Sequence, residues 1–335
     1  MFNSFEDAYL ALLKLATEDY EHHITSRGND AREVIGVGFH LVDPRQRLPY
    51  LAQRQINPVF QFAETLWHLA GRRDLAMIGY YAPSMRSSSA DDLHLGGSAY
   101  GHSLFNTAPA DAVSPFDRVL ELLRTETDSK RGYLPVFSVA ELAISDNPDV
   151  ACLAGLHLLP RDGRLHMVCN MRANDLDGGL LSDVFSFTML QEYAAIQLGL
   201  ELGTYIHFIG SAHVNKRNTS RVRRVLHEVA TRGSALRFPF PAMPTTTTAA
   251  TVTRLLHHED ALRTNQAHYS AHDIASLGFE PYWQQVLLLF EAYRQLQHDQ
   301  VERVASGILQ ALDPGLQWLV SHRWPACSTH GGESR

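Results

Sequence analysis

Cysteine is rare in this chain, with three residues in 335. So few thiols, in an odd number, exclude the disulfide framework of a small secreted domain and favour cysteines that stay reduced. The 18 histidines are not accompanied by a Cys-x-x-Cys or a His-Glu-x-x-His motif, so we expect no metal site. We assign Cys169 to packing in a strand and Cys327 to the tail, which leaves Cys152 as the cysteine of interest.

Long apolar runs and an excess of basic residues are also lacking. No stretch approaches the length of a membrane span, and the first residues lack the basic and apolar regions of a signal peptide. With 29 basic and 36 acidic residues, the bulk charge implies no polyanion-binding surface, and the basic run 221–224 is expected to be a solvated helix face. The prediction is a cytoplasmic protein with no membrane or nucleic-acid partner.

What the chain does have is an alternation of helix and strand signals, with a hydrophobic content of 45% that is enough for a sizeable core. Ser4 and Asn57 are expected to cap helices, the second with Pro58 at its first position. Segments rich in Val, Ile and aromatic residues predict strands at 33–42, 133–139, 151–159, 164–171 and 204–209. These signals indicate an α/β fold.

A Pro- and Thr-rich stretch at 238–253 interrupts this pattern. We predict that it is a linker, which divides the chain into a larger domain at 1–237 and a C-terminal region at 238–335. Apolar stripes predict helices at 282–297 and 300–312, which we expect to pack on the larger domain, and the tail from Cys327 is expected to be frayed.

The segment around Cys152 brings residues with useful chemistry together. Pro160 to Gly163 is a turn sequence between two strand segments, so the hairpin places Cys152 and Arg172 near the same end. Taken alone, a cysteine in a strand is usually an ordinary buried residue. A guanidinium nearby favours the thiolate, however, and a thiolate is the better nucleophile, so we expect Cys152 to be catalytic.

Two acids are candidates for further chemistry. Glu64 lies in a helix with apolar neighbours, where it is either an exposed helix carboxylate or a general acid/base whose pKa is raised by burial. Asp183 follows Ser182, which we expect to cap the next helix. In that first turn Asp183 either interacts favourably with the helix dipole or forms hydrogen bonds that recognise the base of a ligand.

Several motifs follow one another in a fixed order, and together they resemble the thymidylate synthase family over roughly residues 5–235. The motifs are Arg27-Gly28, Glu64-Thr65-Leu66-Trp67, Tyr100-Gly101, Lys130-Arg131, Cys152, Arg172-Ala173-Asn174-Asp175, Asp183 and His213-Val214-Asn215.

The resemblance implies an α/β fold of the thymidylate synthase type, with a bent mixed sheet that is flanked by helices and forms the interface of an obligate homodimer. It implies 5,10-methylenetetrahydrofolate as the one-carbon donor, bound near Asp175 and Gly179. The implied catalytic residues are Cys152, Glu64, Tyr100 and Asp183. The implied nucleotide-binding residues are Arg27, Arg172, Ala173, Asp183, His213 and Asn215 of one subunit, with Lys130 and Arg131 of the other.

Asp183 distinguishes the candidate bases, because the family usually has Asn at this position. Uracil presents an N3–H donor and an O4 acceptor, whereas cytosine presents an N3 acceptor and an N4 amino donor, so a carboxylate favours cytosine. An amide can flip, which makes this a bias rather than a strict rule. An Asp here resembles the cytidylate hydroxymethylase branch of the family, of the kind found in mildiomycin-type nucleoside antibiotic pathways.

The expected reaction is 5-hydroxymethylation of cytidine 5′-monophosphate (CMP), in which water rather than hydride completes the one-carbon transfer. Ala173, Lys130 and Asn215 depart from the family's usual Ser, Arg and Tyr, which predicts room for a 2′-hydroxyl and a preference for CMP over dCMP. The alternatives are C5-methylation of a uridylate and a catalytically dead relative that binds nucleotide or RNA. A pure binder would need no thiol at Cys152.

Overall fold

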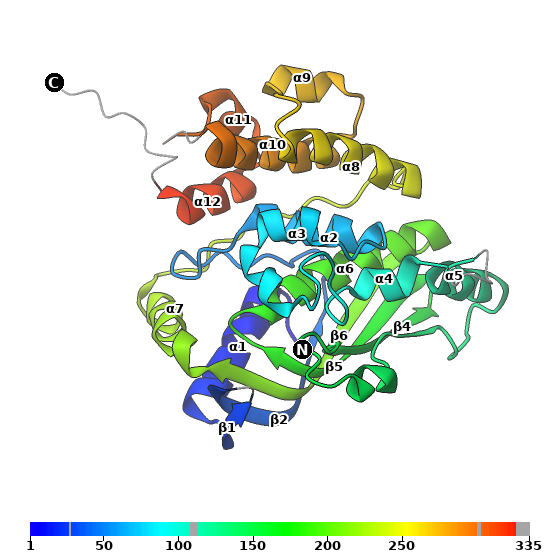
Figure 1. Cartoon of the computed structure of the whole chain (residues 1–335), viewed down its shortest axis with the longest axis vertical. Helices are drawn as coiled ribbons and strands as arrows, with labels where there is room; N and C mark the ends of the chain where they lie inside the picture. Colours follow the sequence, from blue (N-terminus) through cyan, green and yellow to red (C-terminus); the bar gives the residue numbers. More distant parts are fainter. Residues whose placement is uncertain (27, 108–112, 300–302, 326–335) are drawn as a thin grey trace.

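A six-stranded mixed sheet forms the base of the molecule in the computed structural model, which describes residues 1–26, 28–107, 113–299 and 303–325 (Figure 1). The strand order is β1-β2-β6-β5-β4-β3; β5 and β6 run parallel and the other neighbours antiparallel. The strands are β1 (His22–Ser26), β2 (Asn29–Leu41), β3 (Tyr133–Pro135), β4 (Leu153–Arg161), β5 (Arg164–Asp175) and β6 (Glu201–Asn215). The predicted α/β fold with a mixed sheet is confirmed.

Helices cover one face of this sheet. The 20-residue helix α6 (Gly179–Leu198) packs on β5 and β6, and α2 (Pro58–Leu69) packs in turn on α6. The other helices up to residue 231 are α1 (Phe5–Glu18), α3 (Leu75–Tyr81), α4 (Tyr100–Phe105), α5 (Pro115–Thr125) and α7 (Thr219–Thr231), with short 3-10 turns η1 (Pro83–Ser88), η2 (Val139–Ala143) and η3 (Lys216–Asn218).

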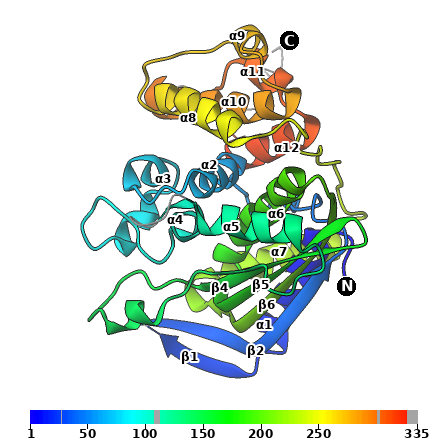
Figure 2. The same cartoon turned by 90° about the vertical axis from the view of Figure 1, so that its right-hand side faces the viewer.

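The C-terminal helices form a further layer above α2 and α3 (Figure 2). They are α8 (Ala249–Arg263), α9 (Ala271–Ser276), α10 (Pro281–Arg294), the π-helical turn η4 (Gln295–Asp299), α11 (Ser306–Ala311) and α12 (Pro314–Arg323). Helix α10 is the centre of this layer and packs against α2, so that its Trp283 and Phe290 join the same hydrophobic core as Phe62 of α2. The predicted helical C-terminal region is confirmed.

Local sequence signals act as expected at several points. Ser4 caps α1 by accepting a hydrogen bond from the Asp7 N–H at 3.3 Å, and Asn57 caps α2 by accepting one from the Phe60 N–H at 3.1 Å. The turn between β4 and β5 consists of Asp162 and Gly163, both with positive φ, which is the geometry that joins two antiparallel strands most directly.

Other boundaries differ from the sequence-based predictions. Ser182 does not cap a helix, because α6 already begins at Gly179, where the buried Leu180 and Leu181 extend its apolar surface. Asp183 therefore lies in the second turn, away from the helix terminus. Strand β6 continues to Asn215, beyond the predicted end at 209, so that His213 lies within the strand.

The predicted linker and the predicted strand at 133–139 are both shorter than expected. Helix α8 starts at Ala249, inside the segment 238–253, because Thr248 caps it by accepting a hydrogen bond from the Thr251 N–H. Strand β3 ends at Pro135, although the N–H groups of Val136 and Phe137 still donate to the carbonyl oxygens of Ala154 and Leu153, and η2 begins at Val139. The predicted tail from Cys327 lies outside the described residues.

Candidate functional site

A cavity of about 640 Å³ brings together residues that are far apart in the sequence. It is lined by Glu64 of α2, Tyr100 of α4, Cys152 before β4, Asp183 of α6 and His213 of β6. Ala173, Asp175 and Gly179, which were also predicted to bind ligands, line the same cavity. The nucleophile, both acids and the phenol predicted from the sequence thus share one space.

Cys152 is held at the end of the β4–β5 hairpin. Its carbonyl oxygen accepts a hydrogen bond from the backbone N–H of Arg172 at 2.8 Å. The Arg172 guanidinium donates to the carbonyl oxygens of Ala151 at 2.7 Å and Val150 at 2.9 Å, which are the two residues before the cysteine. Arg172 is exposed and lies outside the cavity lining, so in this structure it braces the segment that carries the thiol.

Glu64 has the protonation behaviour that an acid/base role requires. Burial, and to a lesser extent the nearby Asp183 carboxylate, raise its pKa to about 8, against a weak hydrogen bond donated by Ser186 at 3.4 Å. The side chain is half-buried, because one side opens into the cavity. At neutral pH Glu64 therefore holds a proton and faces the space in which it could deliver it.

Tyr100 is positioned by the buried His68 of α2. The two rings stack with centroids 5.5 Å apart, and the His68 Nδ1 accepts a hydrogen bond from the Gly101 N–H at 3.1 Å. A Cβ on Gly101 would lie 2.1 Å from the His68 carbonyl oxygen, so only glycine permits this approach. Burial lowers the pKa of His68 to about 3 and raises that of Tyr100 well above 10, so Tyr100 faces the cavity as a neutral phenol.

Asp183 is the second acid of the cavity. One of its oxygens, Oδ2, accepts a hydrogen bond from the Asn174 amide at 2.7 Å. Burial raises the pKa of Asp183 to about 7, although the bond from Asn174 acts in the opposite direction. Because Glu64 and Asp183 influence each other, they titrate as a pair near neutral pH and cannot both ionise without cost.

The predicted phosphate-binding cations are not assembled within one chain. Lys130 and Arg131 are exposed just before β3 and lie outside the cavity lining, and Arg131 pairs with Glu126. Arg27 lies outside the described residues.

The predicted sugar and cofactor residues are linked to one another. The Asn215 amide donates to Oδ2 of Asp175 at 2.8 Å, while Oδ1 of Asp175 accepts from the N–H groups of Asp177 and Gly178. Asp175 therefore shapes the turn that leads into α6. Asn215 lies outside the cavity lining, whereas Ala173 and His213 are part of it.

Several other residues that line the cavity had no predicted function. Asn174 was part of a quoted motif, yet its amide was not recognised as the partner of Asp183. Ser98 is held by the buried Asp149, which accepts hydrogen bonds from the N–H groups of Gly96 and Ser98. Arg323 comes from α12, and no local pattern predicted that the C-terminal region would reach the site.

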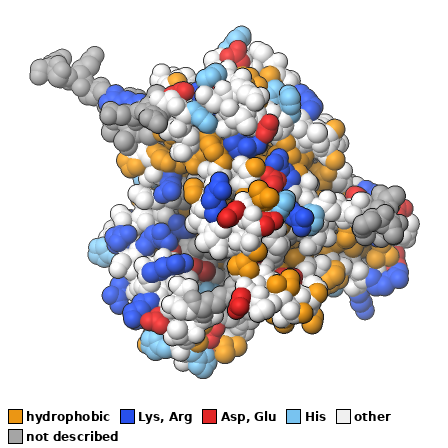
Figure 3. All heavy atoms as spheres, in the orientation of Figure 1, with side chains coloured by type: hydrophobic (Ala, Val, Ile, Leu, Met, Phe, Trp, Pro, Cys, Tyr) orange, Lys and Arg blue, Asp and Glu red, His pale blue; other side chains and the backbone are white. Residues whose placement is uncertain are grey.

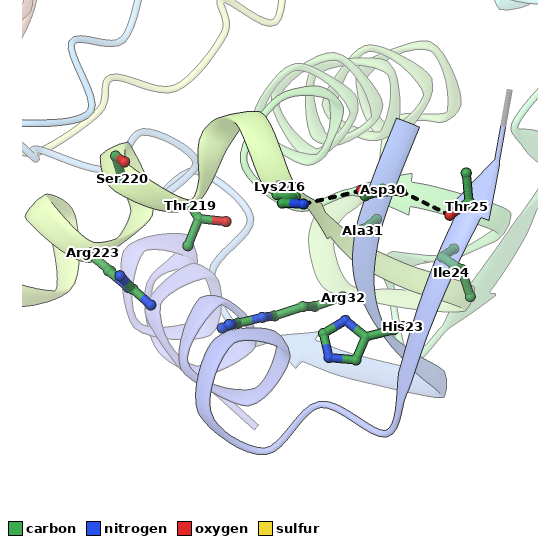
Figure 4. Close-up of a pocket in the computed structure, with 10 residues that line it drawn as sticks. All are labelled: His23, Ile24, Thr25, Asp30, Ala31, Arg32, Lys216, Thr219, Ser220 and Arg223. Atoms are coloured by element: carbon green, nitrogen blue, oxygen red, sulfur yellow. Dashed lines mark hydrogen bonds and ion pairs between the residues drawn. The ribbon is translucent and has the colours of Figure 1, made fainter. Parts of the chain in front are cut away.

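A second cavity of about 480 Å³ lies between the β1–β2 hairpin and the start of α7 (Figure 4). Arg32, Lys216 and Arg223 line it, and Lys216 pairs with Asp30 at 3.3 Å. This is the side on which basic side chains gather near α7 in Figure 3. Its lining contains no predicted catalytic residue, so the candidate chemistry belongs to the first cavity.

Two kinds of feature are absent from the described ranges. No group of three or more His, Cys, Asp or Glu side chains there is arranged to hold a metal ion. Over the same ranges, every helix is too short or too polar to span a bilayer.

Comparisons with known proteins agree on one family. A family model described as thymidylate synthase matches residues 7–256. The chain is 30% identical over 203 residues to the deoxyuridylate hydroxymethyltransferase of Bacillus phage SP01, which covers 57% of this chain and 52% of the phage protein.

Proteins of the same name from Pseudomonas phage M6 and Delftia phage PhiW-14 also match. The first is 29% identical over 181 residues, covering 53% of this chain and 50% of the relative. The second is 28% identical over 207 residues, which cover 58% of this chain and 56% of the relative. The chain thus spans about half the length of the curated relatives it matches.

Proposed function

This chain belongs to the thymidylate synthase family, and on that premise we propose that it transfers a one-carbon unit from 5,10-methylenetetrahydrofolate to C5 of CMP and releases the 5-hydroxymethyl nucleotide. The observation that carries this proposal is the shared cavity of Cys152, Glu64 and Asp183. This cavity supplies a nucleophile, an acid that holds a proton, and a carboxyl group that can form hydrogen bonds with the edge of a pyrimidine base.

Each residue has a defined task in this reaction. The Cys152 thiolate bonds to C6 of the pyrimidine, and the displaced electron pair makes C5 nucleophilic. The folate supplies the one-carbon electrophile. Glu64, protonated below about pH 8, donates its proton to the pyrimidine. Loss of the C5 proton, with departure of tetrahydrofolate, leaves an exocyclic methylene on C5. The Glu64 carboxylate then activates the water that adds to this methylene, and cleavage of the S–C6 bond releases the product and the Cys152 thiolate.

The cavity lining suits the folate donor. Phe60, Tyr81 and Met85 offer apolar surface for the ring systems, and Arg54 and Arg323 bring positive charge for the glutamate carboxylates. Gly178 and Gly179 add no side chain where the turn into α6 faces the cavity. These residues, together with Asp175, would hold the donor beside the nucleotide.

Asp183 supports cytosine as the base. A carboxyl group accepts from the N4 amino group of cytosine, and a proton on its other oxygen can be shared with N3. A pKa of about 7 makes both protonation states available at neutral pH. A second candidate, hydroxymethylation of a uridylate, is favoured by the names of the phage relatives. Those names favour hydroxymethylation over methylation.

The sheet surface supports a homodimer. Ile35 on β2, Phe208 on β6 and Tyr133 on β3 are large hydrophobic residues with 59%, 47% and 39% of their surface exposed. Burying them against a second copy removes apolar area from water. The same assembly would let Lys130 and Arg131 of the other subunit complete the phosphate site.

The sugar preference follows from Ala173. Its methyl side chain lines the cavity, where the family's usual serine would add a hydroxyl. With Lys130 in place of an arginine, the site leaves room for a 2′-hydroxyl, so CMP is preferred to dCMP. A 5-hydroxymethyl CMP product would serve as a modified cytidine nucleotide for a later biosynthetic step, as in nucleoside antibiotic pathways of the mildiomycin type.

The test is the product formed by the purified protein. CMP, dCMP, UMP and dUMP are each incubated with 5,10-methylenetetrahydrofolate, with the Cys152→Ser variant as the control, and the products are analysed by mass spectrometry. We expect CMP to gain the mass of a CH2O unit. A gain of CH2 on a uridylate would establish methylation instead, and binding without any product would establish a non-catalytic binder.

A further inference from the structure

A row of buried polar side chains runs from Asp183 into the core between α6 and the sheet. The Asn174 amide nitrogen is 2.7 Å from Asp183 Oδ2, and the Asn174 oxygen is 2.9 Å from Nε2 of His207. The other ring nitrogen of His207, Nδ1, is 2.6 Å from the hydroxyl of Tyr205. Asn174 is 3% exposed, and His207 and Tyr205 are fully buried.

The direction of this row follows from the hydrogen-bonding capacity of each group. The Asn174 amide nitrogen only donates, so its oxygen must accept from Nε2–H of His207. Burial lowers the pKa of His207 to about 3, so the ring is neutral and its Nδ1 accepts. Tyr205 then donates its O–H to Nδ1. All the donors point the same way, toward Asp183.

His207 is fixed in place on both sides. Its ring stacks on Phe39 of β2 with centroids 5.2 Å apart and planes 13° from parallel. On the other side, His207 lies opposite Cys169 of β5 in the sheet. The Cys169 side chain is also hydrogen-bonded to Tyr205, so the far end of the row is satisfied. The ring has little freedom to turn and break the row.

Such a row is costly in a core unless every member is paired. Apolar side chains of similar size would pack between α6 and the sheet without desolvating polar groups. Asp183 and Asn174 line the cavity, whereas His207 and Tyr205 are fully buried. A ligand in the cavity can therefore reach the row only at its Asp183 end.

We propose that Asn174, His207 and Tyr205 are positioning residues that make Oδ2 of Asp183 an obligate acceptor and leave Oδ1 as the only oxygen that can carry a proton. The groups that titrate next to Asp183 are Glu64 on α2, Tyr100 on α4, Cys169 on β5 and Tyr205 on β6. A carboxyl group with one fixed acceptor oxygen and one fixed donor oxygen matches the hydrogen-bonding edge of cytosine and not that of uracil, whereas a freely rotating carboxyl group does not discriminate between them. This consequence rests on the proposed function.

The first test needs no substrate. Histidine 15N NMR spectra of the full-length protein are recorded between about pH 6 and pH 8, and the His207 signals are assigned through the ring contact with Phe39. We expect the neutral Nε2–H tautomer throughout. The neutral Nδ1–H tautomer would mean that the row runs the other way through a flipped Asn174 amide, with Asp183 as the donor, and would overturn the proposal.

The second test measures base discrimination. CMP and UMP affinities are measured by calorimetry in a Cys152→Ser background, with and without Tyr205→Phe or Asn174→Ala. The matched control is Thr188→Val, which removes another buried hydroxyl from α6, one that is bonded only to the helix backbone at Val184 and Phe185. We expect Tyr205→Phe and Asn174→Ala to reduce the CMP-to-UMP affinity ratio by about tenfold and the control to leave it unchanged.

The outcomes separate this inference from the proposed function. If wild-type protein selects CMP but both row variants keep its ratio, the positioning role is refuted while the proposed function stands. If wild-type protein binds neither CMP nor UMP, the proposed function fails, and the tautomer of His207 still decides whether Asp183 is held as an acceptor. If one variant does not fold, the ratio in the other decides.

Discussion

Replacing Glu64 with glutamine tests both the chemistry and the electrostatics of the cavity. The amide keeps the size of the side chain but holds no transferable proton at neutral pH. For a positioned general acid/base we expect turnover to fall by about 10²–10⁴-fold. Nucleotide affinity should change far less, since the contacts to the phosphate group of the nucleotide and the Asp183 side chain are not altered.

The same substitution should change stability in a pH-dependent way. A carboxyl group whose pKa is raised by folding, here from 4.5 to about 8, keeps its proton in the folded state over a range in which the unfolded chain has lost it. Between those two values the folded state binds more protons, so the free energy of unfolding falls as the pH rises. Glu64→Gln removes this loss.

The size of the effect is set by burial. One pKa unit corresponds to about 1.4 kcal/mol, so a fully dry Glu64 would cost the wild type about 5 kcal/mol by pH 8. Because the side chain opens into the cavity and shares its titration with Asp183, we expect about 1–3 kcal/mol. The variant should match the wild type near pH 5 and exceed its stability near pH 8.

Urea unfolding at these two pH values measures the difference, and steady-state assays of the same samples measure turnover. Glu18→Gln, on the exposed end of α1, is the matched control for loss of a helix carboxylate. If the wild type and Glu64→Gln lose equal stability between the two pH values, the raised pKa is refuted. Near-normal turnover in Glu64→Gln would return this residue to a structural role.

Four more substitutions have defined outcomes. Cys152→Ser should abolish turnover and leave nucleotide affinity within a few fold; a variant that keeps even about a hundredth of wild-type activity would exclude Cys152 as the nucleophile. Asp183→Asn should admit uracil, because an amide can flip to suit either base, and competition between CMP and UMP measures this; an unchanged ratio would limit Asp183 to a structural role. Ala173→Ser and Lys130→Arg should each shift the preference from CMP toward dCMP by about 1–3 kcal/mol, measured by competition between the two nucleotides; equal use of both by the wild type would contradict the argument.

Contacts between neighbouring segments were predictable from the sequence. Cys152 and Arg172 belong to one hairpin, so the turn sequence alone placed them near the same end, although a register shift between Leu153 and Gly155 also sets which residues face each other. Helix starts at Ser4 and Asn57 were predictable for the same reason, because the capping side chain bonds within the same turn. The start of α6 was not, since Gly178 and Gly179 read as a loop while the buried Leu180 and Leu181 continue the helix.

Contacts that depend on strand register could not be predicted from the sequence. The hydrogen bond between Asn174 and His207 joins two parallel strands, β5 and β6, in which Asn174 lies opposite Ala212 and Cys169 opposite His207. A shift of one residue would turn His207 to the opposite face of the sheet and break the row. No local pattern specifies that pairing, which depends on the whole α6 face packing on the two strands.

The C-terminal helices also contribute to the chemistry through packing. Helix α2 would be an ordinary surface helix if only α6 covered it. Instead α10 and α12 pack on α2 as well, and most of the helix is buried. Burial raises the pKa of Glu64, which lies on this helix, and Arg323 of α12 adds a cation to the same cavity. The region after 238 therefore packs on the helix that carries the acid and contributes Arg323 to the cavity lining.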